Sequence, residues 1–420
     1  MDYTREGGVD GKRVELVRDA FVDRFGAVPI RLSRAPGRVE LLGTDTDDAE
    51  GYVLTMAIDK DTWVAYTPTE TTGLIRLYSM NLNSAVEFLL SSGIEESPEN
   101  SEDSVPPSLP AWARYVYGVA SLLPKASPVS AGCDAVIHGT LPIGGGLSSS
   151  ASLELAAFHM FQDICGTSIG PVEAALLCQK AEHQYAGVNC GMLDQYSSAL
   201  GQEGAALLLD CRSLSHIDVA LPAEIDVVVC DTRVSRSLAD SQYGLWKEQC
   251  LDAARQLASS VPGIRTLRDV SLAQFNRYST VIADEVVRAR ARFIVEENVR
   301  VLDMAAALCR DDRDAIARLT AKSFYGMRDL YGKTVREMES MFDAARSSPG
   351  YIGCRQSGGG FGGCLVAFVD SVQVREFVHH TEERYHASTG IDSALFSVHS
   401  SPGAGMVRNT HFRGSSSRAG

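Results

Sequence analysis

The spacing of hydrophobic and polar residues predicts helices and strands along most of the chain. Apolar residues recur at about helical spacing over residues 12–25, and the segment closes at Gly26, so we predict a helix there. Residues 133–141 alternate between apolar and polar positions, and a period of two is typical of a half-buried strand. Residues 151–161 form a long apolar run with few polar interruptions, which predicts a buried helix.

Further strands and a long helical region follow. Residues 205–209 and 225–230 predict short buried strands, and residues 365–369 predict another. Residues 246–347 show helical spacing with many charges and few breakers. Residues 91–110 are rich in Ser, Glu and Pro and predict an exposed loop. This mixture of strands and helices indicates an α/β protein.

A glycine- and serine-rich segment joins the strand at 133–141 to the helix at 151–161. It reads Pro-Ile-Gly-Gly-Gly-Leu-Ser-Ser-Ser-Ala-Ser over residues 142–152. Glycines let a backbone approach a bulky charged group, and the first N–H groups of a helix attract anions. A tight packing corner would need the glycines but not the hydroxyls, so we predict phosphate binding. The candidate residues are Gly144, Gly145, Gly146, Leu147, Ser148, Ser149 and Ser150.

A second segment only approximates a phosphate-binding motif. The Walker motif requires Gly-x-x-x-x-Gly-Lys-Ser/Thr, and the closest match here is Gly332-Lys333-Thr334. The preceding glycine, Gly326, is one residue too far away. We interpret this near match as chance.

Composition and charge narrow the classes of partner. The chain has 420 residues, of which 45% are hydrophobic and 22% charged, which is enough for two globular domains. Its net charge of -14 argues against nucleic acid or an anionic membrane as a partner. The 10 cysteines lack Cys-x-x-Cys spacing, so we expect reduced thiols and no zinc site. The N-terminus has no signal-peptide pattern and no run is long enough to span a membrane, so we expect a cytoplasmic protein.

Several segments in the same order resemble one family. Residues 35–47, Ala-Pro-Gly-Arg-Val-Glu-Leu-Leu-Gly-Thr-Asp-Thr-Asp, resemble the galactokinase signature Gly-Arg-Val-Asn-Leu-Ile-Gly-Glu-His-Thr-Asp-Tyr. Residues 142–154 resemble the phosphate motif of the GHMP small-molecule kinases, and residues 355–364 resemble their third motif, a glycine-rich loop. Residues 181–195 and 241–243 match as well. By resemblance, the chain is identified as a member of the galactokinase family of the GHMP kinase superfamily.

The resemblance implies a fold and a domain division. The family fold is α/β (α+β) with two lobes, an N-terminal lobe like ribosomal protein S5 domain 2 and a C-terminal ferredoxin-like lobe, with the active site between them. We expect an N-terminal domain at 1–205, a C-terminal domain at 206–412 and a disordered tail at 413–420.

The resemblance also implies an activity, that of an ATP-dependent sugar 1-kinase using ATP and Mg²⁺. Asp194 matches the catalytic aspartate that accepts the proton of the anomeric hydroxyl, and Arg38 matches the arginine beside it. Ser149 and Glu182 would ligate Mg²⁺, and Trp112 would lie near the adenine. The sugar-contacting positions implied are Arg38, Thr44, Asp45, Asp47, Gly191, Asp194 and Tyr243.

Simpler roles remain open for these side chains. Asp194 could cap a helix, Arg38 could be a surface charge, Glu182 a solvated helix residue and Trp112 a core residue. We expect a small-molecule sugar and ATP as partners, no nucleic acid or membrane, and a monomer or weak dimer.

The sugar-binding signature departs from the family pattern. Thr44 replaces the usual Glu, which in galactokinases accepts a hydrogen bond from the C6 hydroxymethyl group. Asp45 replaces His, Asp48 replaces Tyr, and Trp246 stands where Arg is frequent. A site that loses an acceptor loses preference for sugars bearing that hydroxyl.

Several substrates therefore stay open. They are galactose, L-arabinose, which lacks C6, and an amino sugar or aminocyclitol, whereas a uronate should be repelled by the added carboxylates. The alternative from another class is a non-catalytic sugar sensor. Such proteins lose residues of the Ser-Ser-Ser-Ala motif, which is intact here at 148–151, so we favour catalysis.

Overall fold

A computed structural model describes most of the chain. It covers residues 9–90, 105–123, 131–142, 144–188, 190–234 and 239–407, without the side chains of residues 9, 10 and 239–243. The predicted tail at 413–420 and most of the predicted loop at 91–110 lie outside these residues.

The first sheet forms the framework of the N-terminal lobe. Its strand order is β12-β1-β2-β5-β3-β4. In addition, β6 pairs with β2, and β7 pairs with β6. β3 and β5 are parallel, and the other described pairs of this sheet are antiparallel. Its strands are β1 (Arg31–Leu42), β2 (Tyr52–Thr69), β3 (Leu74–Ser79), β4 (Ser84–Leu89), β5 (Gly132–Gly139), β6 (Ala205–Asp210), β7 (His216–Ala220) and β12 (Gly405–Met406).

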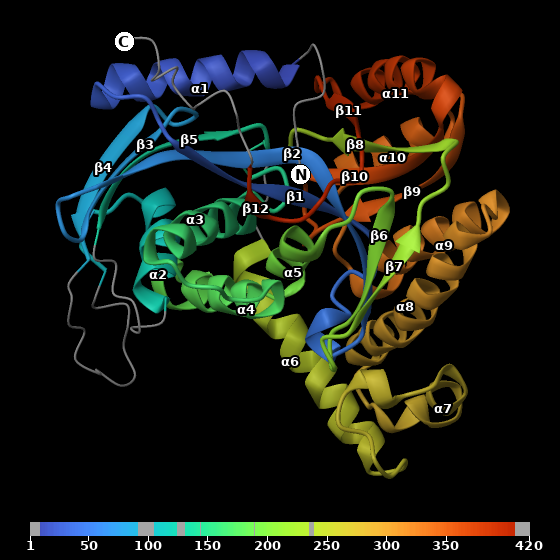
Figure 1. Ribbon diagram of the computed structural model, residues 1–420. Coiled ribbons are helices and arrows are strands. Elements are labelled where there is room, and N and C mark those ends of the chain that lie inside the picture. Colours follow the sequence, from blue (N-terminus) through green and yellow to red (C-terminus); the bar gives the residue numbers. More distant parts are fainter. Residues whose placement is uncertain are drawn as a thin grey trace, which may run out of the picture.

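Helices cover both faces of this sheet (Figure 1). α1 (Val9–Phe25) lies on one face, where Val17 and Phe21 pack against Trp63 and Val136. The other face is covered by α2 (Ala111–Leu122), α3 (Ser149–Cys165), α4 (Pro171–Ala181) and α5 (Leu193–Leu200).

One expectation about burial was wrong. The strand at 133–141 is confirmed as β5, but residues 132–137 are all buried rather than half-buried. The reason is that α1 covers the face that the alternation assigned to solvent.

The second sheet is antiparallel, with the order β11-β8-β10-β9. Hydrophobic residues of α9, α10 and α11 cover one of its faces, and its other face packs against β1, β2 and α8, so the two sheets share a core. Its strands are β8 (Ile225–Asp231), β9 (Tyr351–Ser357), β10 (Cys364–Asp370) and β11 (Ala394–Val398).

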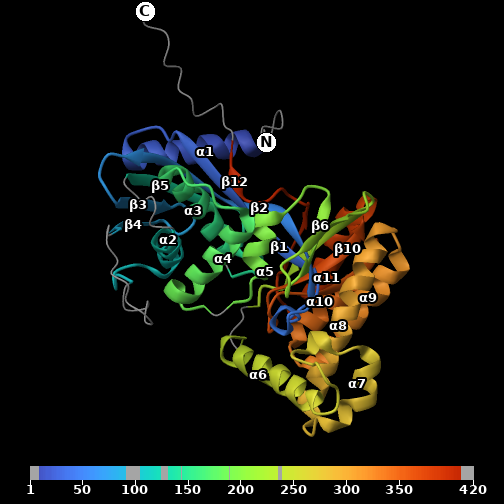
Figure 2. The same ribbon diagram turned by 60° about the horizontal axis from the view of Figure 1, so that its bottom comes forward.

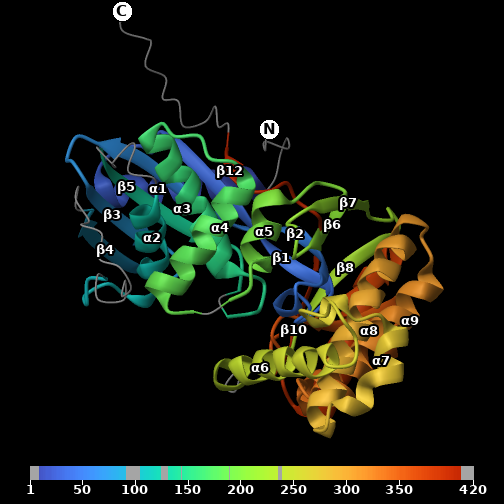
Figure 3. The same ribbon diagram turned by 90° about the horizontal axis from the view of Figure 1, so that it is seen from below.

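The helices of this lobe between residues 246 and 347 confirm the predicted helical region, and one more helix follows β10. They are α6 (Ala239–Ala258), α7 (Leu272–Tyr278), α8 (Glu285–Cys309), α9 (Arg313–Gly326), α10 (Arg336–Arg346) and α11 (Val374–Thr389). Figures 2 and 3 show α6 and α7 at the outer margin of this lobe, away from the first sheet.

Segments from beyond residue 205 return to the first sheet. β6 and β7 pair with it directly, and β12, near the end of the described chain, pairs with β1 at Ser33 and Arg34. The predicted division at 205/206 stays a prediction. Among the described residues no helix is long and apolar enough to cross a membrane.

Candidate active site

The Gly144–Ser150 segment forms a wall of a cleft between the lobes. Gly144 and Gly146 have φ of 74° and 78°, values that favour glycine, so these residues allow the chain to turn sharply from β5 into α3. Ser148 also has a positive φ, 59°, and its buried hydroxyl has no hydrogen-bond partner among the described residues. α3 begins directly after it, at Ser149. Unsatisfied donors at the start of a helix of 17 residues suit an anion.

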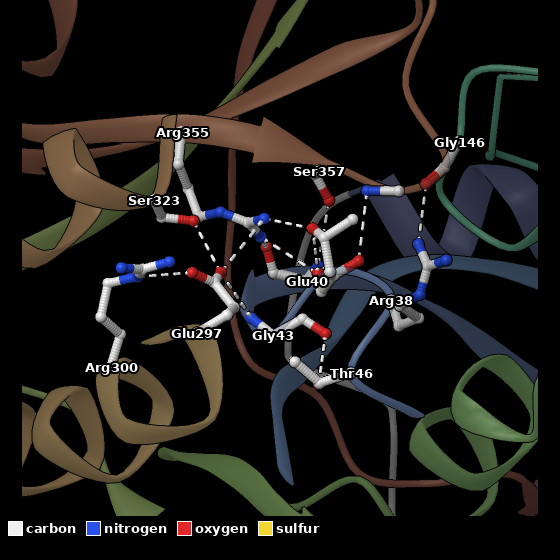
Figure 4. Close-up of polar contacts among 12 residues, drawn as sticks. Arg38, Glu40, Gly43, Thr46, Gly146, Glu297, Arg300, Ser323, Arg355 and Ser357 are labelled. Atoms are coloured by element: carbon white, nitrogen blue, oxygen red, sulfur yellow. Dashed lines mark hydrogen bonds and ion pairs between the residues drawn. The ribbon is translucent and has the colours of Figure 1, made fainter. Parts of the chain in front are cut away.

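Arg38 and Asp194 line the same cleft as the phosphate-loop residues. Arg38, on β1, donates to Asp194 Oδ1 through Nε at 2.9 Å and through Nη2 at 2.5 Å. Its third nitrogen, Nη1, donates to the carbonyl oxygen of Gly146 at 2.7 Å (Figure 4). The side chain of Arg38 is buried, whereas that of Asp194 is 26% exposed. A fixed arginine therefore holds a carboxylate that remains accessible from the cleft.

A group of buried carboxylates lies beside this pair. Gln195 Nε2 donates to Glu182 Oε2 at 2.6 Å and to Glu154 Oε2 at 2.9 Å. Burial raises the pKa of Glu182, and the negative charge of Asp194 adds to this shift. Burial also raises the pKa of Glu154, with Glu182 as the next cause. The hydroxyl of Ser150 forms a hydrogen bond with Glu182.

Among the described residues no group of three or more His, Cys, Asp or Glu side chains could hold a metal ion by itself, so a divalent cation here would also need oxygen atoms of hydroxyls and phosphates. The second oxygen of Glu154 is buried without a hydrogen-bond partner among the described residues. Mutually repelling carboxylates next to hydroxyls and a phosphate loop are the oxygen donors that Mg²⁺ accepts. The predicted ligands Ser149 and Glu182 lie on α3 and on the turn after α4, and their role stays a prediction.

The predicted sugar contacts Asp47 and Gly191 lie against each other. A Cβ atom placed on Gly191 would lie 2.0 Å from Asp47 Oδ2, so only glycine leaves room for this carboxylate. Burial raises the pKa of Asp47 well above its usual value, and the charges of Asp48, Asp45, Glu40 and Asp194 add to the shift. The Asp47 carboxylate is thus held in an acidic region that also includes the candidate proton acceptor.

The Thr44 hydroxyl forms hydrogen bonds with other side chains of the protein. It donates to Glu40 Oε1 at 2.5 Å and accepts a hydrogen bond from Arg355 Nη2. Arg355 also donates through Nη1 to Glu40 Oε1 at 3.2 Å and to the Glu40 carbonyl oxygen at 3.1 Å. Arg355 is on β9 and Glu40 on β1, so this contact joins the two lobes.

Glu40 also holds the start of the third motif. Its backbone N–H donates to Ser357 Oγ at 3.1 Å, and its Oε2 accepts from the N–H of Gly358 at 3.3 Å. On the other side, Glu297 of α8 lies 4.0 Å from Arg355 Nη2 and accepts from Arg300 Nε at 2.6 Å. The result is a buried chain of alternating charges between the lobes (Figure 4).

Asp45 forms another ion pair between the lobes. Lys333 Nζ lies 2.6 Å from Asp45 Oδ2, and both side chains are buried. The ammonium also lies 4.8 Å from the centre of the Trp246 ring, which stacks on Phe361 of the third motif. The near match at residues 332–334 is thus no phosphate loop, but its lysine reaches the sugar-binding signature.

Two predicted residues receive no support or test from this geometry. Trp112, on α2, is partly buried, donates from Nε1 to Ser84 Oγ at 3.2 Å and packs on the N-terminal core. Its adenine-binding role stays a prediction. The side chain of Tyr243 lies outside the described residues.

Comparisons with known proteins agree with this architecture. Residues 114–202 match the GHMP kinases N terminal domain, and residues 304–386 match the GHMP kinases C terminal domain. A mevalonate kinase structure has a TM-score of 0.59 and 15% identity over 88% of this chain and 98% of that chain, which is similarity of fold. The fold and the cleft therefore define a GHMP kinase, with the two lobes that we expected.

The family within this class follows from closer relatives. Residues 19–68 match the galactokinase galactose-binding signature. The chain is 38% identical to the galactokinase of Roseiflexus sp. (strain RS-1) over 93% of this chain and 96% of that protein. It is 39% identical to the galactokinase of Canis lupus familiaris over 89% of this chain and 93% of that protein. The crystal structure of Lactococcus lactis galactokinase complexed with galactose has a TM-score of 0.83 and 28% identity, covering 92% of this chain and 98% of that chain.

The chain therefore belongs to the galactokinase family, as its motifs predicted, and it is an ATP-dependent sugar kinase.

Sequence reasoning missed several residues of the site. Glu40 differs from the Asn of the family signature, a signal that could have been noted, and Arg355 begins the third motif. Lys333 gave no usable signal, because its partner is 288 positions away in the sequence.

Proposed function

We propose that this chain transfers the γ-phosphoryl group of ATP to the anomeric hydroxyl of galactose, giving galactose 1-phosphate and ADP. The observation that carries the proposal is that the Arg38–Asp194 pair and the Gly144–Ser150 loop line one cleft. Phosphoryl transfer depends mainly on positioning and on neutralising charge, and one cleft that holds both groups can supply both.

The phosphate end would hold the nucleotide through the backbone. The first N–H groups of α3 and the Ser148 hydroxyl would donate to phosphate oxygens. Arg38 would keep the loop in place through the Gly146 carbonyl oxygen and add positive charge beside the transferring group.

Asp194 would accept the proton of the attacking hydroxyl. Both Arg38 contacts go to Oδ1, so Oδ2 is the oxygen that can face the acceptor. The hydroxyl oxygen forms a bond to the γ-phosphorus, the bond from that phosphorus to the bridging oxygen of ADP breaks, and the proton goes to the carboxylate. The guanidinium of Arg38 keeps this carboxylate oriented for the transfer.

Mg²⁺, held by Ser149 and Glu182, would neutralise charge on the phosphate oxygens. The buried carboxylates around Glu182 support a cation here, because burial and, to a smaller extent, nearby negative charge raise the pKa of both Glu182 and Glu154. Ser150 is the other candidate hydroxyl, since it already forms a hydrogen bond with Glu182.

L-Arabinose is the second candidate substrate, and one observation favours it. The Thr44 hydroxyl is already shared between Glu40 and Arg355, so it offers little to a C6 hydroxymethyl group. The Asp45–Lys333 pair neutralises one of the carboxylates that would favour an amino sugar. A sensor without catalysis is disfavoured because the Arg38–Asp194 pair and the serine motif are both in place.

The test is a substrate panel followed by one substitution. Galactose, L-arabinose, galactosamine and galacturonate are each supplied with MgATP, and ADP release and the position of the new phosphate are measured. Galactose should give the highest kcat/KM, with the phosphate at C1. Phosphate at another carbon, or no ADP release with any sugar, would refute the proposal.

Asp194→Asn should lower kcat by about 10³-fold, because a positioned general base contributes roughly 10² to 10⁴. MgATP binding, measured by calorimetry, should be retained. Asp218→Asn, at an exposed position on β7, is the matched control and should keep full activity. Near-normal turnover by Asp194→Asn would remove Asp194 from its role.

A further inference from the structure

A second arginine, from the C-terminal lobe, lines the same cleft as the phosphate loop. Arg233 follows β8 in the C-terminal lobe, and its side chain is 56% exposed. The cleft that contains Gly144–Ser150, Arg38 and Asp194 is also lined by Arg233 and its neighbours. Among the described lining residues, Arg38 and Arg233 are the ones that carry positive charge.

The turn that carries Arg233 is fixed to the third motif. Thr232 donates to the Gly363 carbonyl oxygen through its backbone N–H at 3.1 Å and through Oγ1 at 2.7 Å. The N–H of Gly363 donates in return to the Val234 carbonyl oxygen at 3.0 Å. Tyr385 donates from its hydroxyl to the Thr232 carbonyl oxygen at 2.9 Å. This turn is therefore held by both α11 and the glycine-rich loop.

The same turn is linked to the phosphate loop. Gly363 also lines the cleft, and the next residue, Cys364, donates from Sγ to the Gly145 carbonyl oxygen at 2.8 Å. The segment that carries Arg233 is thus connected, through Gly363 and Cys364, to the glycine-rich phosphate loop.

The backbone of Arg233 adopts a conformation that is unusual for its residue type. Its φ is 60°, in the left-handed region that Gly, Asn and Asp favour. The N–H of Arg233 donates to Asp231 Oδ1 at 2.9 Å, which stabilises the turn. An arginine kept in a strained turn at a cleft indicates a use for its side chain.

The nearby carboxylate of Asp231 does not explain why an arginine side chain is placed at this cleft. The carboxylate of Asp231 lies 3.7 Å from Arg233 Nε, too far for a hydrogen bond, and ion pairs with an exposed partner contribute little. The polyphosphate of a nucleotide is a stronger partner, because guanidinium groups pair with two phosphate oxygens at once. The chain as a whole carries a net charge of -14, so a local cation is needed to draw an anion into the cleft.

We propose that Arg233 binds the polyphosphate of ATP from the C-terminal lobe and stabilises the transferring phosphoryl group. The proposal rests on the proposed kinase function. Arg38 acts from the N-terminal lobe through Asp194 and Gly146, and Arg233 acts from the C-terminal lobe. The two lobes then each contribute one guanidinium to the reaction.

The test uses Arg233→Gly, because glycine adopts the same backbone conformation without strain and the substitution removes the whole side chain with its charge. Arg233→Lys keeps a charge but loses the paired contacts, and Arg255→Ala, at a 74% exposed position on α6, is the control. MgATP affinity is measured by calorimetry without sugar, and kcat and both KM values are measured with galactose.

Arg233→Gly should bind MgATP at least about 10-fold more weakly and lose about 10²-fold or more in kcat, while the KM for sugar stays within about 2-fold. Arg233→Lys should recover part of both losses, and Arg255→Ala should match the wild type. MgATP affinity in Arg233→Gly equal to that of the wild type would overturn the proposal. Should the wild type bind MgATP but phosphorylate no sugar, the kinase proposal fails while the calorimetry still decides the role of Arg233.

Discussion

The two ends of the candidate active site are built in different ways. The phosphate end consists of consecutive residues, Gly144–Ser150, and works mainly through backbone groups and the start of α3. The sugar end consists of side chains from both lobes, paired through Glu40–Arg355 and Asp45–Lys333. One end is a local structure, and the other depends on how the lobes pack.

This difference explains where the chain departs from its family. The phosphate motif is complete, whereas the sugar signature carries Glu40 where the family pattern has Asn and Thr44 where it has Glu. Buried Arg355 needs a carboxylate, because an unpaired buried charge is costly. Here Glu40 supplies it, and Thr44 connects the two through its hydroxyl. Within this signature, the glutamate is therefore at position 40 in this chain and at position 44 in the family pattern.

Thr44→Glu is expected to have the largest effect on this comparison. A second carboxylate would be buried at the place where Thr44 Oγ1 lies 2.5 Å from Glu40 Oε1, with one arginine to neutralise both. We expect a loss of about 3 kcal/mol in the free energy of unfolding, the cost typical of an uncompensated buried charge. Urea denaturation measures it.

The double variant Glu40→Asn/Thr44→Glu separates charge from position. It returns one carboxylate to Arg355 and should recover most of the lost stability. It should also raise the preference for galactose over L-arabinose, since a glutamate side chain introduced at position 44 can accept from a C6 hydroxyl. A double variant as unstable as Thr44→Glu would mean that the exchange of positions is not compensatory.

The same contrast sets the limit of prediction from sequence. β5, the glycine loop and α3 were predicted because glycines, hydroxyls and an apolar run are adjacent in the chain. The pairing of Lys333 with Asp45 was not predicted, since it forms only after α8, α9 and a left-handed turn at Gly332 bring the lysine to the turn that follows β1. The burial of β5 on both faces was missed for the same reason, because α1 packs there from a distant part of the sequence.

Gly191→Ala tests the sugar end without disturbing the fold. Its Cβ would lie 2.0 Å from Asp47 Oδ2, and the mobile end of that side chain can move away. Losing a hydrogen bond to a charged group costs about 1.5 to 3 kcal/mol, so the KM for sugar should rise at least about 10-fold. Steady-state kinetics and a thermal unfolding curve measure both quantities.

Two glycine variants serve as the matched comparison. Gly144→Ala meets no atom within 4 Å but has a φ of 74°, so it should strain the phosphate loop and raise the KM for ATP rather than for sugar. Gly170→Ala, with open space and a φ of -70°, should change neither. A rise in the KM for ATP with Gly191→Ala, equal to that for sugar, would contradict the separation of the two ends.

Asp47→Asn should show the smallest effect and carries a pH dependence. Burial and nearby carboxylates raise the pKa of Asp47 in the folded protein, so the folded chain binds a proton that the unfolded chain releases. The ionised form therefore destabilises the fold at neutral pH, and this cost disappears as the pH falls below the raised pKa. Asp47→Asn should gain about 1 kcal/mol at pH 8, as substitutions of strained site residues commonly do.

The gain should shrink as the pH is lowered through the raised pKa of Asp47, because the wild-type carboxyl then takes up its proton and resembles the amide. Saturating galactose should raise the unfolding temperature of the wild type more than that of Asp47→Asn, since a tighter ligand stabilises more. A stability difference that is constant between pH 8 and pH 5 would assign the effect to packing rather than charge. In that case the sugar end would differ from the phosphate end in being built from side chains of both lobes. Its carboxylates would not lower the free energy of unfolding through their charge.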